Sequence, residues 1–359
     1  MLFKTSCQFL LFVFVMCMSV FSAQAGENTP YFVDVYRSRQ INSEQIISKF
    51  GKQLQEIANI YGDRRNLEKN ALKAVTLKDN LDKQLKKLGD FSYIELSLIQ
   101  YPLNRKIYFT IDVIDKIDQN RLPHFTSYPH HSVTDPYNLV KSWRTYELTA
   151  MRLSWNGDLK QVKSCSQLHC VYGFEHADLK KYENIFDTKV PKSKSQLIKV
   201  LRYDKDEYNR AAAAYLLGHL RNGQELISIL KPYMWQSSSA VRNAVMRVMG
   251  VALLNMKATH PDFPIKDAVT ALDFPTLTDR NKALVILSAL ANQPRYAKYI
   301  IQHASDNLME ELKQVQLNVH GLAYDTLRNM SHQKYGERDY AAWEAWLAKK
   351  KQEYAKQQS

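Results

Sequence analysis

The residues of this chain that could bind a metal lie in its middle third. His124, His130, His131 and Asp135 fall within one short segment, and zinc accepts both imidazole and carboxylate ligands. Adjacent histidines point to opposite faces of an extended backbone, whereas a metal needs ligands that converge at about 2 Å. We therefore expect no metal site here. A secreted hydrolase or metal-dependent enzyme with its site in this middle segment is the alternative.

Two cysteines, Cys165 and Cys170, follow in the same part of the chain. In an exported protein such a close pair is expected to form a local disulfide, and closing so short a loop stabilises the fold by about 2 kcal/mol. Two other roles stay open. A redox pair normally has two intervening residues rather than four, and a zinc site would need further ligands such as His169 and His176.

This sequence lacks the common catalytic motifs. It contains no glycine-rich phosphate loop, nucleophile elbow, HExxH motif or spaced CxxC pair. The carboxylates Asp204, Asp206 and Glu207 precede a helical pattern, where acidic residues are common. We therefore predict a protein without catalytic residues and without a cofactor.

The N-terminal segment predicts export. Lys4 precedes a continuous apolar run, Phe9 to Phe21, and Ala23 and Ala25 form a small-x-small cleavage site. This order of parts is typical of a secretory signal peptide, here residues 1–25. The apolar run of 13 residues is shorter than the roughly 20 that a membrane-spanning helix needs. We expect cleavage after Ala25 and a periplasmic or secreted protein.

The composition is that of a folded, basic protein. With 45% hydrophobic and 24% charged residues the chain is neither disordered nor collagen-like, and its 359 residues suggest two domains. The formal net charge is +13. Export and the lack of a nucleic-acid motif exclude nucleic acid as a partner. Lipid headgroups, an anionic envelope polysaccharide, a host partner or an acidic protein surface fit this charge, although lysines that only add solubility would produce it too.

Residues 30–118 predict a small α+β domain. Alternating aromatic and β-branched residues are typical of strands, and they occur over 31–36, 91–100 and 106–115. Between the first two strands, apolar residues at three- and four-residue steps predict helices over 46–60 and 77–88. The predicted order is strand, helix, helix, strand, strand.

This order resembles that of a polypeptide-transport-associated (POTRA) domain. The resemblance includes the run Leu85 to Ser92, which leads into paired strands that end in Phe109 to Val113, and it covers about a quarter of the chain. It implies a module that binds other envelope proteins, often by adding a partner strand to an open sheet edge. Such an edge carries unpaired backbone N–H and C=O groups. The alternative is a small α+β domain whose open sheet edge has no role in binding.

Residues 119–192 predict a folded junction that contains the cysteine loop. Prolines interrupt its first part, and helical spacing returns over 137–153. Another short helix is expected ahead of Pro191, because proline ends most helices. Aromatic and aliphatic residues occur throughout, which is not typical of a flexible linker.

Residues 193–355 predict a repeated helical structure. Three segments share an arginine, then alanines, then aliphatic residues at helical spacing, and their arginines, spaced by 32 and 38 residues, are Arg210, Arg242 and Arg280. Alanine on an inner face lets two helices pack closely, and larger aliphatic residues fill the seam. The last segment, 337–352, predicts an amphipathic helix that caps the open end of the stack.

Val241-Arg242, followed by Ala244 and apolar residues up to Gly250, resembles the second helix of a HEAT repeat, and the resemblance covers almost half the chain. It implies an all-α, right-handed solenoid whose equivalent arginines usually hydrogen-bond within and between repeats. In the other interpretation, Arg210, Arg242 and Arg280 are exposed and form a basic ridge for a partner that carries carboxylate or phosphate groups.

These features predict a multi-domain, exported, non-catalytic scaffold protein of the bacterial cell envelope. We expect partner proteins to bind at the sheet edge and on the helical-repeat surface, which offers long faces and few deep pockets. Contact of the basic surface with a membrane or an anionic polymer is a further alternative.

Overall fold

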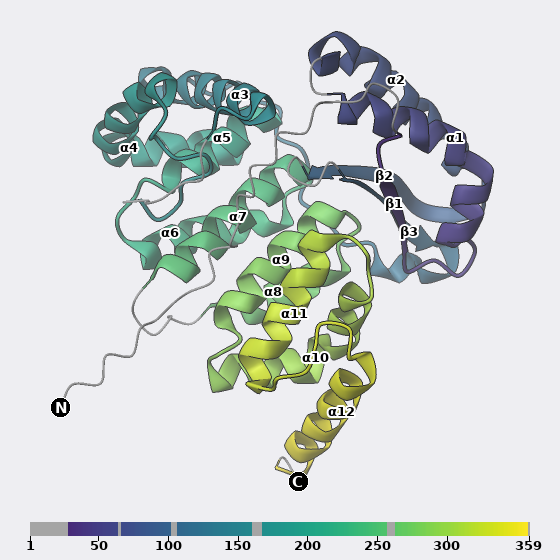
Figure 1. Cartoon of the computed structure of the whole chain (residues 1–359). Helices are drawn as coiled ribbons and strands as arrows, with labels where there is room; N and C mark the ends of the chain where they lie inside the picture. The colour runs from purple at the N-terminus through teal and green to yellow at the C-terminus, as the bar shows by residue number, and fades with distance from the viewer. Residues whose placement is uncertain (1–27, 64–65, 102–105, 160–166, 257–262, 358–359) are drawn as a thin grey trace, which may run out of the picture.

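The structure, a computed structural model, describes residues 28–63, 66–101, 106–159, 167–256 and 263–357. It is mostly helical, with one small three-stranded sheet near the N-terminus (Figure 1). The predicted leader, with Ala23 and Ala25, lies outside the described residues, so cleavage and export stay predictions.

The N-terminal part contains the small α+β unit expected from the sequence, with its elements in the predicted order. These elements are β1 (Tyr31–Tyr36), α1 (Ser43–Gly62), α2 (Leu67–Leu85), β2 (Phe91–Tyr101) and β3 (Lys106–Asp115). The strands lie in the order β1-β3-β2, with β1 parallel and β2 antiparallel to the central β3. Asn42 caps α1 through a capping box with Gln45, which fixes where that helix begins.

The two faces of the sheet differ because side chains alternate along each strand. On β3, Ile107, Phe109 and Ile111 pack in one apolar core with α1 and α2. Thr110 and Asp112 are also completely buried, although they point to the other face. The sheet is therefore covered on both faces, and the helical part of the chain covers the polar one (Figure 1).

The rest of the chain is helical. Its elements are η2 (Lys116–Arg121), η3 (Pro136–Asn138), α3 (Leu139–Asn156), α4 (Ala177–Tyr203), α5 (Glu207–Leu217), α6 (Gly223–Leu230), η4 (Lys231–Trp235), α7 (Ser239–Asn255), α8 (Ile265–Thr270), η5 (Ala271–Asp273), α9 (Leu277–Leu290), α10 (Pro294–Leu312), α11 (Leu317–Ser331) and α12 (Tyr340–Lys356). Here η denotes a 3-10 helix. One hydrophobic core runs from α3 to α12.

Four of these helices, α5, α7, α9 and α11, pack side by side, and we call them the inner row (Figure 1). The helices between them along the chain, α6, α8 and α10, pack on the outside of this row. Small residues allow the close approach. A Cβ atom on Gly250 of α7 would lie 2.8 Å from Val285 Cγ1 of α9, which is closer than normal van der Waals contact.

The middle of the chain differs from the sequence prediction. No short helix ends before Pro191. Instead α4 continues through Pro191 to Tyr203, so the domain boundary placed at residue 193 falls inside a helix. Pro191 has no N–H for the carbonyl of Asp187, which removes one helical hydrogen bond. Buried Phe186, Val190 and Leu197 hold the helix on both sides of that position.

The glycines of the inner row provide a matched test of this packing. We expect Gly250→Ala to lower the free energy of unfolding by about 1–3 kcal/mol, because the added methyl group overlaps Val285. Gly321→Ala should raise it by up to about 1 kcal/mol, because alanine favours the helix and a Cβ there meets no atom within 4 Å. Urea denaturation measures both values. Equal effects of the two substitutions would contradict the packing of α7 on α9.

Candidate functional site

The three repeated arginines are buried, with exposed fractions of 0% for Arg210, 2% for Arg242 and 0% for Arg280. Each guanidinium group donates a hydrogen bond to a carbonyl in the loop just before its own helix. The acceptors are Asp204 O at 2.7 Å, Gln236 O at 2.7 Å and Pro275 O at 3.3 Å. The repeated contact shows that the three side chains are structurally equivalent.

Two of these arginines also form hydrogen bonds with a neighbouring helix. Arg242 of α7 donates from Nε and Nη2 to the two carboxylate oxygens of Asp279 at 3.0 and 2.7 Å. Arg280 of α9 donates from Nε to Glu311 of α10 at 2.7 Å. The ring of Phe125 covers Arg242 at 3.8 Å. These side chains therefore form internal hydrogen bonds, as the HEAT resemblance implies, and do not form an exposed ridge.

Arg280 joins the helical part to the sheet. Its Nη2 forms an ion pair with Asp112 Oδ1 of β3 at 2.8 Å, and its Cζ lies 3.6 Å from the ring centre of Tyr36 of β1. With Glu311, the group brings together two strands and two helices, and we call it the Arg280 cluster. All four side chains are buried, so each depends on the others for its charge or hydrogen-bonding partners.

The electrostatics of the Arg280 cluster are those of a buried network. Burial raises the pKa of both Asp112 and Glu311, and the positive charge of Arg280 opposes that change. For Arg280, burial alone would lower the pKa, but the charges of Asp112 and Glu311 outweigh burial and raise it. The guanidinium group therefore stays charged, and one cation is shared between two carboxyl groups.

Aspartates on the polar face of the sheet also cap two inner helices. Asp112 Oδ2 accepts from Leu277 N, the first residue of α9, at 2.9 Å. Asp34 of β1 accepts from Val315 N and Gln316 N, just before α11, at 3.1 and 2.9 Å. The first N–H groups of a helix have no partner within it and carry partial positive charge. The sheet thus supplies the acceptors that these helix ends lack.

Residues 122–135 extend the same contact along the row, and we call them the strap. Thr126 N donates to Trp235 O at 2.8 Å, before α7, and Lys205 N donates to His131 O at 2.6 Å, before α5. The chain therefore passes the starts of α11, α9, α7 and α5 in turn as it runs from Asp34 to His131. The N-terminal half covers the whole end at which the inner row begins.

The histidines considered as metal ligands lie on the strap. His124, His130 and His131 are exposed, and Asp135 accepts from Val140 N and Lys141 N at the start of α3. Among the residues that the structure describes, no three His, Cys, Asp or Glu side chains lie close enough to hold a metal ion.

The second group of sequence candidates surrounds the cysteine loop. Cys165 lies outside the described residues, so its disulfide with Cys170 stays a prediction. His176 Nδ1 accepts from Asp178 N at the start of α4, which is a capping role. His169 is buried and stacks on Tyr215. Burial, reinforced by the charge of Arg247, lowers the pKa of His169 to about 3, which keeps its ring neutral.

In the described part of the chain the outer edge of β2 pairs with no other strand, although one of its outward N–H groups is already bonded to a side chain of α2. Leu96 N donates to Asp82 Oδ1 of α2 at 2.8 Å, and Ile107 N, opposite Gln100, donates to Pro30 O on the β1 side at 3.0 Å. These two contacts show that Leu96 and Gln100 each lie opposite a β3 residue in a non-hydrogen-bonded pair. The N–H and C=O groups of both residues therefore point away from β3. In an antiparallel ladder such pairs alternate, so alternate N–H and C=O groups of β2 point outward.

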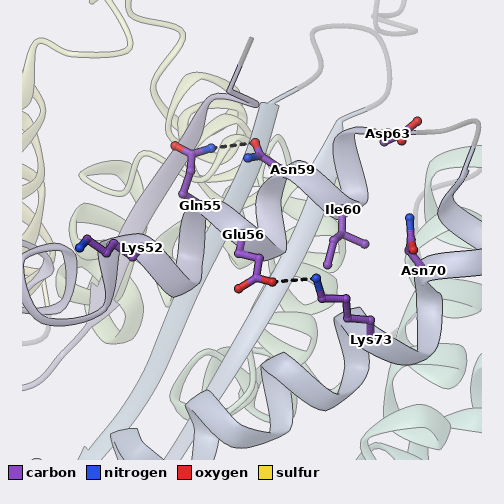
Figure 2. A pocket seen from close by; sticks show the side chains of 9 residues that line it. Lys52, Gln55, Glu56, Asn59, Ile60, Asp63, Asn70 and Lys73 are labelled. Carbon is purple, nitrogen blue, oxygen red and sulfur yellow. Dashed lines mark hydrogen bonds and ion pairs between the residues drawn. The ribbon is translucent and has the colours of Figure 1, made fainter. Parts of the chain in front are cut away.

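A cleft of about 620 Å³ lies between α1 and α2. Most of its lining side chains are polar, and two pairs of them are bonded to each other, as Figure 2 shows. Lys73 pairs with Glu56 at 2.8 Å, and Gln55 donates to Asn59 at 3.0 Å. Among the described residues, its lining includes no serine, threonine, cysteine, histidine or tyrosine, and we do not assign chemistry to it.

Comparisons with known proteins found no match. No protein-family model matches this chain, and no curated protein and no solved structure is similar to it. Among the described residues, no helix has the length and apolar character needed to span a bilayer.

The Arg280 cluster predicts a large, specific loss of stability. Asp112→Ala leaves Arg280 without one of its anions and Leu277 N without its acceptor, so we expect the free energy of unfolding to fall by about 3–5 kcal/mol. Urea denaturation measures it. As a control, Asp118→Ala breaks an ion pair with Arg39, whose side chain is 72% exposed, and should cost at most about 1 kcal/mol.

The double substitution Asp112→Ala/Arg280→Met tests whether the two groups act together. Because the first change already removes their contact, the double variant should lose less stability than the sum of the single losses. Additive losses, or an Asp112→Ala loss as small as that of Asp118→Ala, would contradict the cluster.

Proposed function

We propose that this protein is an exported, non-catalytic scaffold of the bacterial cell envelope, which binds a partner protein by strand addition at the outer edge of β2. The observation that carries the proposal is that alternate backbone N–H and C=O groups of β2, a strand of 11 residues, point away from β3. One of them, Leu96 N, is bonded to Asp82 of α2, and a partner strand would have to replace that bond or pair beside it. A partner segment in extended conformation would continue the ladder through its own backbone groups.

The rigid support of the sheet favours this role. β3 is buried on both faces, and the Arg280 cluster fixes it to α9 and α10. A strand edge held on such a support keeps its hydrogen-bonding groups in register before a partner arrives, which reduces the entropy lost on binding. The helical half therefore holds the binding edge in place and adds its own exposed surface for a second partner.

Several features support the family likenesses proposed with this function. The element order and strand order of the N-terminal part agree with a POTRA-like module. Arg210, Arg242 and Arg280 each bond a carbonyl just before their own helix. Arg242 and Arg280 also bond a neighbouring helix, which supports HEAT-type repeats, and a right-handed solenoid is part of this proposal. Residence in the periplasm or outside the cell rests on the predicted leader at residues 1–25.

A photoreactive side chain placed on the edge tests the proposal. Glu95 of β2 is exposed, and we expect p-benzoylphenylalanine at position 95 of the full-length protein to cross-link one partner protein in intact cells. The same group at Gln119 of η2, which is also exposed, serves as the position control and should capture little of that partner.

Two substitutions at Gln100 separate backbone from side-chain effects. Both remove the side-chain hydrogen bond to Tyr61 O, but Gln100→Pro also removes the outward N–H, whereas Gln100→Ala keeps it. We expect Gln100→Pro to reduce the cross-link at position 95 at least fivefold and Gln100→Ala to preserve it. Equal capture by the two variants, or equal capture from positions 95 and 119, would refute strand addition at this edge.

A further inference from the structure

A pair of cations, Arg247 of α7 and Lys282 of α9, lies on two neighbouring helices of the inner row. Gly250 of α7 meets Val285 of α9, and the starts of these helices meet through Arg242 and Asp279, so the two helices run parallel. Arg247 and Lys282 each lie three residues, about one helical turn, before that contact. Arg247 and Lys282 therefore lie side by side on neighbouring helices.

Neither cation has an anionic partner in contact. Among the residues that the structure describes, no carboxylate lies within 4.0 Å of Arg247 or Lys282. Lys282 Nζ donates only to the side-chain oxygen of its neighbour Asn281, and Arg247 Nε is buried without any acceptor. An unpaired buried donor on a charged group costs free energy, which an incoming anion would recover.

The surroundings of the pair are mixed in charge. The charge of Arg247 acts on Glu147 of α3, His169, Tyr172 and Tyr215, and the charge of Lys282 acts on His169. Burial raises the pKa of Glu147, and the positive charge of Arg247 opposes this. His169 is neutral at physiological pH, as described above. Glu147 is therefore the one carboxyl group of this set, and it forms no ion pair with either cation in the described structure.

Lys282 shows the electrostatic cost of this arrangement. Burial, and then the charge of Arg247, lowers the pKa of Lys282 to about 7. Both residues keep a part of their surface exposed to solvent. A lysine whose pKa lies near neutral pH, beside an arginine, is a common feature of sites that bind anions or perform chemistry.

We propose that Arg247 and Lys282 form a binding site for one oxyanion, the carboxylate or phosphate group of a ligand that enters along the inner row. Arginine binds such groups through two parallel N–H donors, and lysine adds a compact charge. The site is independent of strand addition at β2, since the two use different residues on different halves of the chain.

Thermal unfolding of the full-length protein in different salts tests the proposal. Sodium sulfate represents a phosphate group, sodium acetate represents a carboxylate, and sodium chloride at equal ionic strength is the reference. A ligand that binds the folded state raises the unfolding midpoint. We expect sulfate, acetate or both to raise it in the wild-type protein, and the anion with the larger effect identifies the type of group that binds.

Matched variants separate this site from the general stabilising effect of sulfate. Arg247→Met and Lys282→Met should lose the anion-specific part and weaken apparent anion affinity at least tenfold, while Lys199→Met, at an exposed position of α4, should respond as wild type. No anion-specific shift in the wild-type protein, or the same shift in Arg247→Met as in Lys199→Met, would overturn the proposal.

A second readout follows Lys282 itself. Its amine should react with fluorodinitrobenzene at pH 7.5 at least tenfold faster than that of Lys199, because only an amine with a lowered pKa is largely unprotonated there. The binding anion should slow this reaction, and Arg247→Met should slow it too by raising the pKa of Lys282. An anion shift that is larger at pH 8.5 than at pH 6.5 would contradict a role for protonated Lys282, since neither sulfate nor acetate changes charge over that range.

Discussion

A guanidinium group enclosed by two carboxyl groups and a tyrosine ring joins the two halves of this protein. Arg280 has no water-facing surface, and neither have Asp112 and Glu311. Removing one member of a buried ionic network leaves the others charged or polar without a partner, which costs far more than losing a surface ion pair. The sheet and the helical row are therefore expected to be stable only together.

The same contact explains how the helical row is closed at one end. Its helices begin with N–H groups that need acceptors, and Asp112 and Asp34 of the sheet provide them at α9 and just before α11. The strap adds backbone hydrogen bonds to the segments just before α7 and α5. The chain itself covers the arginine row, so the alternative in which these arginines form an exposed surface for another molecule does not hold. In the described part of the chain, the features to which we assign binding are the outer edge of β2 and the pair Arg247 and Lys282.

Local patterns in the sequence predicted local structure well. Period-two alternation located β1, β2 and β3, and the repeated arginine–alanine pattern identified equivalent helices. The burial of Arg280 could not be predicted, because its partner Asp112 is 168 residues away and no local rule relates the two. One signal was present: Asp34 and Asp112 stand in the middle of apolar strands, where an aspartate needs a buried partner. The predicted end of α4 at Pro191 was wrong because buried neighbours outweigh one lost hydrogen bond.

Native-state hydrogen exchange, resolved by residue, tests most directly whether the two halves unfold as one unit. Amides of β3 and of α9 should open with the same free energy, and Asp112→Asn should lower both values by the same amount, because the Arg280 cluster makes them one cooperative unit. If the β3 amides opened at a much lower free energy than those of α9, or if the substitution affected the sheet alone, the halves would be independent and this account would be contradicted.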